Sequence, residues 1–257
     1  MQHRTFCEGL ARQAGIIMKK HFHHSLEKEW KADATPVTIA DKEINRLVIT
    51  AIHEAYPGHD IIGEEESSIN HQSEYVWVCD PVDGTIPYSH GIATAVFMLA
   101  LVHNGNPIAG VVYDPFMDRM YYAEQDQGCF LNGERVQVND EADFKQTVVG
   151  LESWSNAPFD MDALRGLFAK EGTKVLKICC IGYASMLIAS GQITATLFAG
   201  TTVHDGAALK IIIEEAGGKV TDLFGNEQRW DRPIKGFIAS NGQLHAKVVE
   251  LVSSIIK

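Results

Sequence analysis

The residues best suited to chemistry are two aspartates that directly follow a short apolar run. Residues 75–79 are apolar and predict a buried strand, and the motif Asp-Pro-Val-Asp-Gly-Thr then occupies 80–85. Asp80 and Asp83 offer hard oxygen ligands for a divalent cation, and the Val82 carbonyl between them is a third. The glycine that follows lets the backbone come close to a ligand, so that neighbouring amides can face an anion. Carboxylates for a cation beside amides for an oxyanion predict a phosphate-ester site.

The same motif also has a purely structural interpretation. Asp-Pro and Asp-Gly are common turn dipeptides, and both residue types suit turns for backbone reasons alone. The motif follows a buried strand, and it has acidic partners elsewhere in the chain. These two features favour a functional site.

Three other acidic positions are candidate partners of this motif. Asp41 lies three residues after Thr38, which is a capping-box pattern at a helix start, so capping by itself explains both residues. The acids at 64–66 end a short apolar strand, and they are either a solvated charge run or side chains presented at a sheet edge. Asp205 lies where an apolar helix is expected to begin, which suits an N-cap and also a metal ligand near a bound phosphate. We expect its neighbour His204 to pack or to make a simple hydrogen bond.

Charge and composition argue against several classes of function. The chain has 257 residues and a formal charge of −11, which argues against a nucleic-acid partner, because binding a phosphate backbone requires a basic face. An acidic protein that handles phosphate esters needs cations at its site. No apolar run approaches the ~20 residues that span a bilayer, so no membrane partner is expected. The five cysteines form no C-x-x-C pair, and their odd number favours a reducing, cytoplasmic compartment.

Sequence periodicity predicts a mixed α+β chain. Helices are expected near residues 2–22, 39–55, 160–170, 183–190, 205–216 and 243–256, with a short helix or turn at 85–91. Strands are expected at 60–63, 75–79, 92–102, 108–113, 119–124, 128–131, 134–138, 148–151, 175–179, 195–199 and 237–240. Turn signals between the strands from 92 to 138 predict an antiparallel meander. A polar stretch near 140 then divides the chain into an N-terminal subdomain, 1–140, with most metal ligands, and a C-terminal subdomain, 141–257, with the last metal aspartate and a substrate wall.

Four separated motifs occur in a fixed order along the chain. They are V-T-x-x-D at 37–41, G-E-E at 63–65, D-P-V-D-G-T at 80–85, and D-x-A-A followed by E-A-G-G within 205–218. This ordered set resembles the inositol monophosphatase family of magnesium-dependent, lithium-sensitive phosphomonoesterases, and the resemblance covers nearly the whole chain. It implies a layered αβαβα sandwich of the kind shared with fructose-1,6-bisphosphatase, a homodimer, and a small phosphorylated substrate.

The resemblance also assigns roles to individual residues. Two or three Mg²⁺ ions would be bound by Glu65, Asp80, the Val82 carbonyl, Asp83 and Asp205, with Asp80 bridging two ions. Asp41 and Thr85 would orient and help deprotonate the attacking water, and Glu65 would also serve catalysis. The phosphate and the rest of the substrate would be met by Asp83, Gly84, Thr85, Gly182, Tyr183 and Asp205.

Several positions depart from the family pattern. His204 stands where tryptophan is usual, Phe198 where an acid contacts inositol hydroxyls, Gly182-Tyr183-Ala184 where Gly-Thr-Ala is usual, and Leu209 where glycine follows Ala-Ala. A phenylalanine removes a hydroxyl acceptor, so these changes alter the wall that meets the alcohol. The substrate implied is a small polyol or sugar phosphate resembling inositol 1-phosphate. Histidinol phosphate, fructose 1,6-bisphosphate and 3′-phosphoadenosine phosphate are the alternatives.

Two other kinds of function are alternatives to a phosphatase. One is a protein that keeps the fold but only senses phosphate or metal. The other is a structural α+β protein with coincidental turns. A binding protein does not need a water-activating pair, so the presence of Asp41 and Thr85 favours the enzyme.

Overall fold

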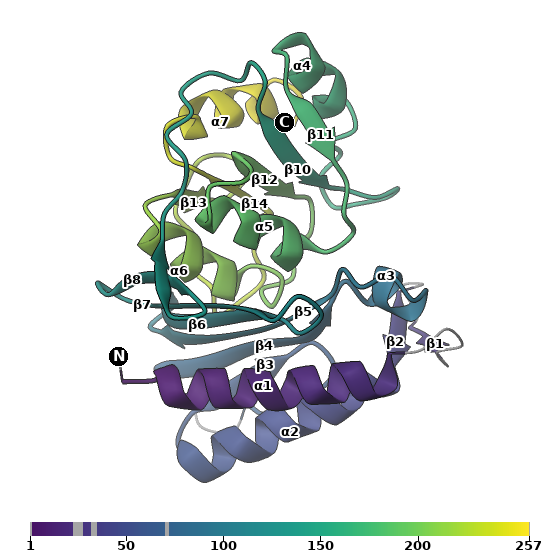
Figure 1. Ribbon diagram of the computed structural model, residues 1–257, viewed down its shortest axis with the longest axis vertical. Coiled ribbons are helices and arrows are strands. Elements are labelled where there is room, and N and C mark those ends of the chain that lie inside the picture. Colours follow the sequence, from purple (N-terminus) through teal and green to yellow (C-terminus); the bar gives the residue numbers. More distant parts are fainter. Residues whose placement is uncertain (1, 23–27, 32–34, 70–71, 257) are drawn as a thin grey trace.

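Five layers of helices and sheets form the protein (Figure 1). The computed structural model describes residues 2–22, 28–31, 35–69 and 72–256. From the bottom of Figure 1 upward, the helical layers are α1 (Arg4–His21) and α2 (Ile39–Ala55), then α5 (Ile181–Ala189) and α6 (Ala207–Glu215), then α4 (Leu164–Lys170) and α7 (His245–Ser253). A seven-stranded sheet and a five-stranded sheet lie between these layers. The expected layered αβαβα sandwich is therefore confirmed.

The seven-stranded sheet follows chain order from one edge to the other. Its strands are β3 (Asp60–Gly63), β4 (Tyr75–Asp83), β5 (Val96–His103), β6 (Asn106–Asp114), β7 (Arg119–Glu124), β8 (Gly128–Leu131) and β9 (Glu134–Val136). The β3–β4 pair is parallel and every later pair is antiparallel, so the predicted meander is confirmed. Several strand ends differ from the prediction, most of all those of β4 and β5. β4 continues through the Asp-Pro-Val-Asp motif, and β5 begins at Val96 because the segment before it folds back onto α3 (Thr85–Ser89), with Ile92 N–H donating to Pro87 O.

The five-stranded sheet belongs to the second half of the chain. Its order is β11 (Lys174–Leu176), β10 (Val148–Glu152), β12 (Ala195–Phe198), β14 (Phe237–Ser240) and β13 (Lys219–Thr221). The prediction missed β13 and also the small sheet of β1 (Lys28–Trp30) and β2 (Pro36–Thr38). Each has only three residues, as do β9 and β11, but those two were predicted as parts of longer segments. The division into subdomains at residue 140 stays a prediction.

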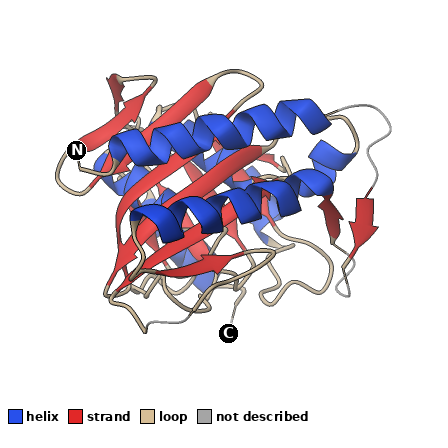
Figure 2. Cartoon of the chain, turned by 90° about the horizontal axis from the view of Figure 1, so that it is seen from below, coloured by secondary structure: helices blue, strands red, loops and turns tan. Residues whose placement is uncertain are grey.

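The seven-stranded sheet is covered on both faces. Along β4, Val76 and Val78 pack in the cluster shared with α5 and α6, whereas Trp77 and Cys79 pack in the cluster shared with α1 and α2. Figure 2 shows α1 and α2 side by side across the outer face of this sheet. Burial on both faces explains why this strand is a continuous apolar run instead of an alternating one. It also places the end of β4 deep inside the protein.

Two further features of the fold are the state of its cysteines and the length and apolar character of its helices. All five cysteines are free, and four of them are buried. Within the described parts of the chain, every helix falls short of the length and apolar character that crossing a bilayer requires. The cytoplasmic location stays a prediction.

His245, at the start of α7, makes the stability of this fold dependent on pH. The ring is buried between two hydroxyls, with Nδ1 2.8 Å from Ser240 Oγ and Nε2 2.9 Å from Thr221 Oγ1. Burial, together with nearby Lys219, lowers the pKa of His245 to about 4. An unfolded histidine has a pKa of about 6.5, so between pH 6.5 and 4 the unfolded chain binds the proton more readily. The contribution of His245 is therefore complete above pH 6.5 and is lost as the pH falls.

We expect this effect to appear as a difference between the wild type and His245→Gln. Denaturant unfolding at pH 7.5 and pH 5 should show the stability advantage of the wild type shrinking by about 2 kcal/mol at the lower pH. The comparison cancels the titration of all other groups. Parallel curves for the two proteins would contradict the assignment.

Candidate active site

A bulge at the end of β4 turns both motif aspartates to the same face of the sheet. Asp80 pairs with Met98 and Asp83 pairs with Val96, so three steps along β4 match two steps along β5. Side chains alternate along a regular strand, so residues three apart would otherwise point to opposite faces. The Asp80 carboxylate accepts the Val82 N–H at 3.1 Å, which stabilises the bulge. Both carboxylates are buried.

Glu64, and not Glu65, lies beside Asp80. β3 and β4 are parallel with Gly63 opposite Cys79, and Glu64 N–H donates to Cys79 O at 3.1 Å. The next pair along this register is Glu64 with Asp80, and paired residues of neighbouring strands face the same side. A ligand oxygen of Glu64 accordingly lies within 4.8 Å of one of Asp80. Glu65 lies beyond the end of β3 and belongs to a group of ligand atoms with Glu64 and Asp41.

A lysine from the small sheet neutralises part of this acidic cluster. Lys31 Nζ donates to Glu64 Oε1 at 2.9 Å and to Glu65 Oε1 at 2.5 Å. Burial opposes the charge on Lys31, but the two carboxylates outweigh burial and raise the pKa of its ammonium. The sequence interpretation did not identify Lys31. An isolated lysine outside the motifs gives no signal in the sequence.

Asp41 connects the start of α2 to the motif turn. Its Oδ2 accepts the Thr38 backbone N–H at 2.8 Å and the Thr38 hydroxyl at 2.5 Å, so the predicted capping box is present. Its Oδ1 lies 3.4 Å from the Thr85 hydroxyl, which also donates to Val82 O at 2.9 Å. One aspartate therefore caps a helix with one oxygen and reaches Thr85 with the other.

Asp205 reaches the cluster from the loop between β12 and α6. The predicted helix start at Asp205 is wrong, because α6 begins at Ala207 with Gly206 as its N-cap. The carboxylate of Asp205 accepts instead from the Thr202 hydroxyl. Its ligand oxygens lie within 4.8 Å of those of Asp80 and Asp83. The final aspartate thus meets the motif pair although 122 positions separate Asp83 and Asp205.

Three overlapping groups of ligand atoms arise among the described residues, each with all members within 4.8 Å of one another. They are Asp80, Asp83 and Asp205; Glu64, Asp80 and His204; and Asp41, Glu64 and Glu65. Asp80 belongs to two groups, and so does Glu64. The first and third groups contain only carboxylate oxygens, which suit Mg²⁺, and a shared carboxylate can bridge two ions. The donor set therefore fits a centre with more than one divalent cation.

Burial, together with neighbouring acids, raises the pKa values of these carboxyl groups. Burial, with the charges of Glu64 and Asp83 added, raises the pKa of Asp80 well above its usual range. Burial and the charge of Asp205 raise the pKa of Asp83 to about 7. Burial likewise raises the pKa of Asp41 to about 7 although its hydrogen bonds from Thr38 oppose the shift. Buried like charges of this kind are stabilised by bound metal ions.

Gly84 and Gly182 allow close backbone approach beside the carboxylates. Gly84 has φ +87°, and a Cβ there would lie 2.7 Å from Thr94 O, so a side chain is excluded. It is the N-cap of α3, whose first amides have no partner within the helix. Gly182 N–H donates to Asp83 Oδ2 at 2.5 Å, and a Cβ at Gly182 would lie 2.8 Å from that oxygen. The roles of Gly84 at the phosphate and of Gly182 at the substrate stay predictions, and the Gly182 amide is bonded to Asp83 in this structure.

The chain matches the inositol monophosphatase family model over residues 2–257. The chain belongs to the inositol monophosphatase family. Enzymes of this family are hydrolases that act on phosphoric monoesters, and so is this protein. The fold expected from the ordered motifs and the geometry described above agree with this membership.

Relatives and solved structures cover nearly the whole chain. The "Fructose-1,6-bisphosphatase/inositol-1-monophosphatase" of Thermotoga maritima is 30% identical over 100% of this chain and 98% of its own. "Inositol monophosphatase 1" of Bos taurus is 28% identical over 96% of this chain and 92% of its own. The solved structure of a Thermotoga maritima IMPase has a TM-score of 0.89 at 29% identity, covering 99% of this chain and 98% of that one.

The predicted substrate wall has an aromatic residue, Phe198, where the family pattern has an acid. The ring of Phe198 packs between Trp154 and Phe237, with ring centroids 5.9 and 5.3 Å away. Tyr183 lies in α5, and the guanidinium of Arg119 covers its ring at 4.9 Å. Leu209 lies in α6 and is fully buried in the core, so core packing accounts for a large side chain at this position. The Tyr183 ring is thus occupied by Arg119, and its role in binding substrate stays a prediction.

Glu152 is a further residue that the sequence interpretation missed. It ends β10 and accepts the N–H groups of Ile178 and Cys179 at 2.8 and 3.0 Å. Cys179 has φ +59°, and it is followed by Cys180, whose thiol donates to Asp83 at 3.0 Å. Glu152 therefore positions the loop that contacts Asp83. An acid that ends an apolar strand, as at Asp80, is the sequence signal that predicts such a role.

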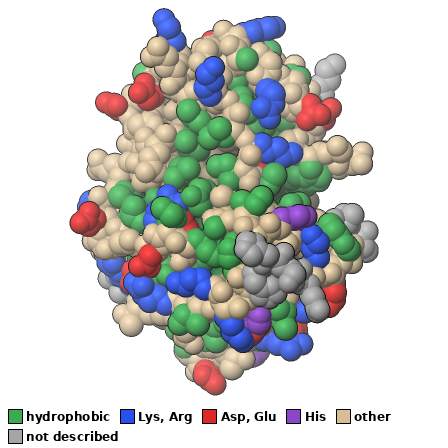
Figure 3. All heavy atoms as spheres, turned by 45° about the vertical axis from the view of Figure 1, so that its right-hand side comes forward, with side chains coloured by type: hydrophobic (Ala, Val, Ile, Leu, Met, Phe, Trp, Pro, Cys, Tyr) green, Lys and Arg blue, Asp and Glu red, His purple; other side chains and the backbone are tan. Residues whose placement is uncertain are grey.

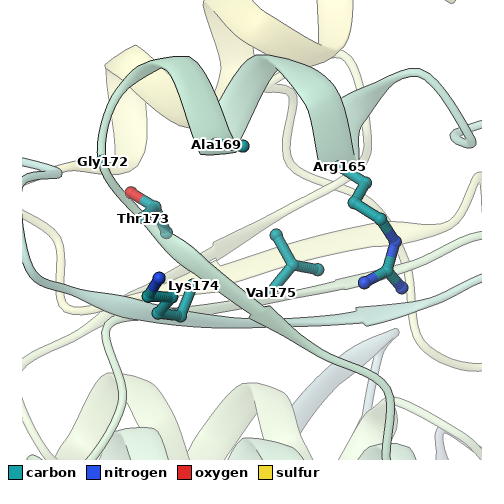
Figure 4. Close-up of a pocket in the computed structure, with 6 residues that line it drawn as sticks. All are labelled: Arg165, Ala169, Gly172, Thr173, Lys174 and Val175. Atoms are coloured by element: carbon teal, nitrogen blue, oxygen red, sulfur yellow. The ribbon is translucent and has the colours of Figure 1, made fainter.

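Two surface pockets lie in different parts of the molecule. One of about 160 Å³ lies beside the start of α3 and is lined by Ile86, Pro87, His90, Ile92, Thr94, Ile178 and Cys179. Figure 3 shows the side of the molecule that carries α3, where hydrophobic side chains gather across the middle of the face. A pocket of about 230 Å³ lies instead between α4 and β11, lined by Arg165 and Lys174 among others (Figure 4). None of its lining residues belongs to the carboxylate cluster.

Proposed function

We propose that this family member is a Mg²⁺-dependent phosphomonoesterase for a small polyol or sugar phosphate resembling inositol 1-phosphate. The observation that carries the proposal is the convergence of carboxylates from the ends of β3 and β4 and from the loop before α6. They meet beside Gly84, the N-cap of α3, and the first amides of a helix have no partner within it.

Two or three bound Mg²⁺ ions would neutralise the phosphate dianion and lower the pKa of water at the site. We assign Asp80, Asp83 and Asp205 to one position, with the Val82 carbonyl nearby, since these carboxylates form one group. We assign Glu64 with Asp80 to the second position, in place of the Glu65 expected from the sequence. Glu65, with Asp41 and Glu64, would serve a third position.

The chain's own residues would hold the water and move its proton. Asp41 Oδ1 faces the Thr85 hydroxyl at 3.4 Å, so Asp41 can accept the Thr85 proton while Thr85 oxygen takes one from the attacking water. The short hydrogen bonds from Thr38 fix the carboxylate in this orientation. The backbone amides of Gly84 and Thr85 would bind phosphate oxygens and keep the phosphorus in line with the water.

Phe198 bears on the choice of the alcohol part of the substrate. Phe198 offers no hydroxyl acceptor, which favours a substrate with an apolar or aromatic face, such as histidinol phosphate, as the second candidate. The two activities in the name of the Thermotoga maritima relative make fructose 1,6-bisphosphate another candidate. The family resemblance further leads us to propose a homodimer that is inhibited by lithium.

A substrate panel tests the proposal directly. Release of inorganic phosphate would be measured from inositol 1-phosphate, histidinol phosphate, fructose 1,6-bisphosphate and 3′-phosphoadenosine phosphate, with Mg²⁺ and again with EDTA. We expect Mg²⁺-dependent release with at least one of them. No release from any member in the presence of Mg²⁺ would contradict the proposed function.

A further inference from the structure

His204 is the one nitrogen donor within the three groups of ligand atoms formed by the described residues. One of its ring nitrogens lies within 4.8 Å of ligand oxygens of both Glu64 and Asp80. The three side chains come from the β12–α6 loop and from the ends of two parallel strands. The imidazole is therefore part of the same cluster as the carboxylates, although the sequence suggested packing or a simple hydrogen bond for it.

The structure offers little support for that simpler role. The His204 Nε2 lies 3.6 Å from Asp205 Oδ2, which is too long for a hydrogen bond. No hydrogen bond between described residues uses the His204 ring. The side chain is 15% exposed, so it is largely removed from solvent. Asp80 belongs to the same group. Its Oδ1 accepts the backbone N–H of Val82.

The spacing of the group suits a single ion. Ligand atoms at about 2.1 Å from an octahedral ion lie about 3 Å apart when adjacent and about 4.2 Å apart when opposite. The ligand atoms of this group lie within 4.8 Å of one another, a limit close to these separations. Lys31 shares Glu64 through Oε1, which leaves Oε2 of the same carboxylate for an ion.

Imidazole nitrogen and carboxylate oxygen differ in the ions they favour. Carboxylates suit Mg²⁺, whereas imidazole suits transition ions, whose affinity for mixed nitrogen and oxygen sites exceeds that of Mg²⁺. We propose that His204 is a ligand and makes the Glu64–Asp80 position selective for a divalent first-row transition ion. The Asp80–Asp83–Asp205 position keeps an all-oxygen set and remains suited to Mg²⁺. The centre is then a mixed-metal centre. This inference rests on the proposed function because it uses the same carboxylates.

The test uses Mn²⁺ as a paramagnetic probe on the full chain after removal of metals. Electron paramagnetic resonance would count the Mn²⁺ ions that stay bound in the presence of excess Mg²⁺. Pulsed spectra of the same sample would record ¹⁴N couplings, which a bound His204 imidazole would produce. For the wild type we expect one retained Mn²⁺ per chain with a ¹⁴N coupling.

Two variants at the same position separate ligation from folding. His204→Phe should lower the preference for Mn²⁺ over Mg²⁺ at least about tenfold and abolish the ¹⁴N coupling. His204→Gln keeps the polarity and supplies an oxygen, so it should keep Mg²⁺ binding but lose the ¹⁴N coupling and the Mn²⁺ preference. His53→Gln is the matched control, because His53 is exposed, lies outside the carboxylate cluster and contacts Ser68 Oγ through Nε2. It should behave as the wild type.

The possible outcomes distinguish this inference from the proposed function. A wild type that binds both ions but shows no ¹⁴N coupling, or a His204→Gln variant with unchanged selectivity, would overturn the role of His204 and leave the proposed function standing. A wild type that binds neither ion would overturn both. Loss of the ¹⁴N coupling in His204→Gln, with the coupling retained in His53→Gln, would support the inference.

Discussion

Asp83→Asn is expected to reduce phosphomonoester hydrolysis roughly 10³-fold or more, because it removes a negative charge from the proposed metal position. Asp83 Oδ2 accepts the Gly182 N–H and the Cys180 thiol. The amide oxygen of asparagine would take over these bonds, so the fold should persist. Its NH₂ group would then point where the second carboxylate oxygen lies in the wild type, and it would repel a cation.

A second readout of the same variant does not depend on turnover. For the wild type, Mg²⁺ at about 100 times its dissociation constant should raise the melting temperature by roughly 5–10 °C. Asp83→Asn should lose most of this rise. Without divalent cations at pH 8 it should melt above the wild type, because burial and Asp205 raise the pKa of Asp83 and thus disfavour its charge in the folded state.

Asp140→Asn is the matched control for this experiment, since Asp140 is exposed and outside the carboxylate cluster. It should keep both the activity and the Mg²⁺-induced rise in melting temperature. Full activity in Asp83→Asn, or an undiminished response to Mg²⁺, would contradict the assignment of Asp83 as a ligand.

Asp41→Asn is expected to lower kcat by roughly 10²–10⁴-fold, the range for loss of a group that accepts a proton. The carboxylate contacts Thr85 through one oxygen and caps α2 through the other. An asparagine oxygen can still accept from Thr38, but its amide cannot take a proton from Thr85. Steady-state kinetics should therefore show a large change in kcat and a small change in KM.

The capping role of Asp41 needs its own measurement. Thr38→Ala removes the hydroxyl from the same capping box and should lower the free energy of unfolding by about 1 kcal/mol. Its loss of activity should be far smaller than that of Asp41→Asn at a temperature well below both melting points. Equal losses of activity in the two variants would show that Asp41 acts through helix capping alone.

Local pattern was sufficient for much of the architecture and for the central motif. The apolar periodicity of α2 and the turns of the meander are short-range features, and the structure contains both. The Asp80–Asp83 motif was recognisable because acids that end an apolar strand are unusual. The four motifs in order also indicated the family. β13 was missed because a strand of three residues is too short to show a periodic pattern.

The sequence by itself determined the residue types of the site and the family, because both are carried by motifs contiguous in the chain. Only the tertiary structure decided which acids face one another. Glu64 and Glu65 are adjacent in sequence, and the parallel register of β3 on β4 selects Glu64 for Asp80. Likewise, the path of the β12–α6 loop brings His204 to these carboxylates. Which side chains face one another depends on strand register and on packing between distant segments. The local sequence determines neither.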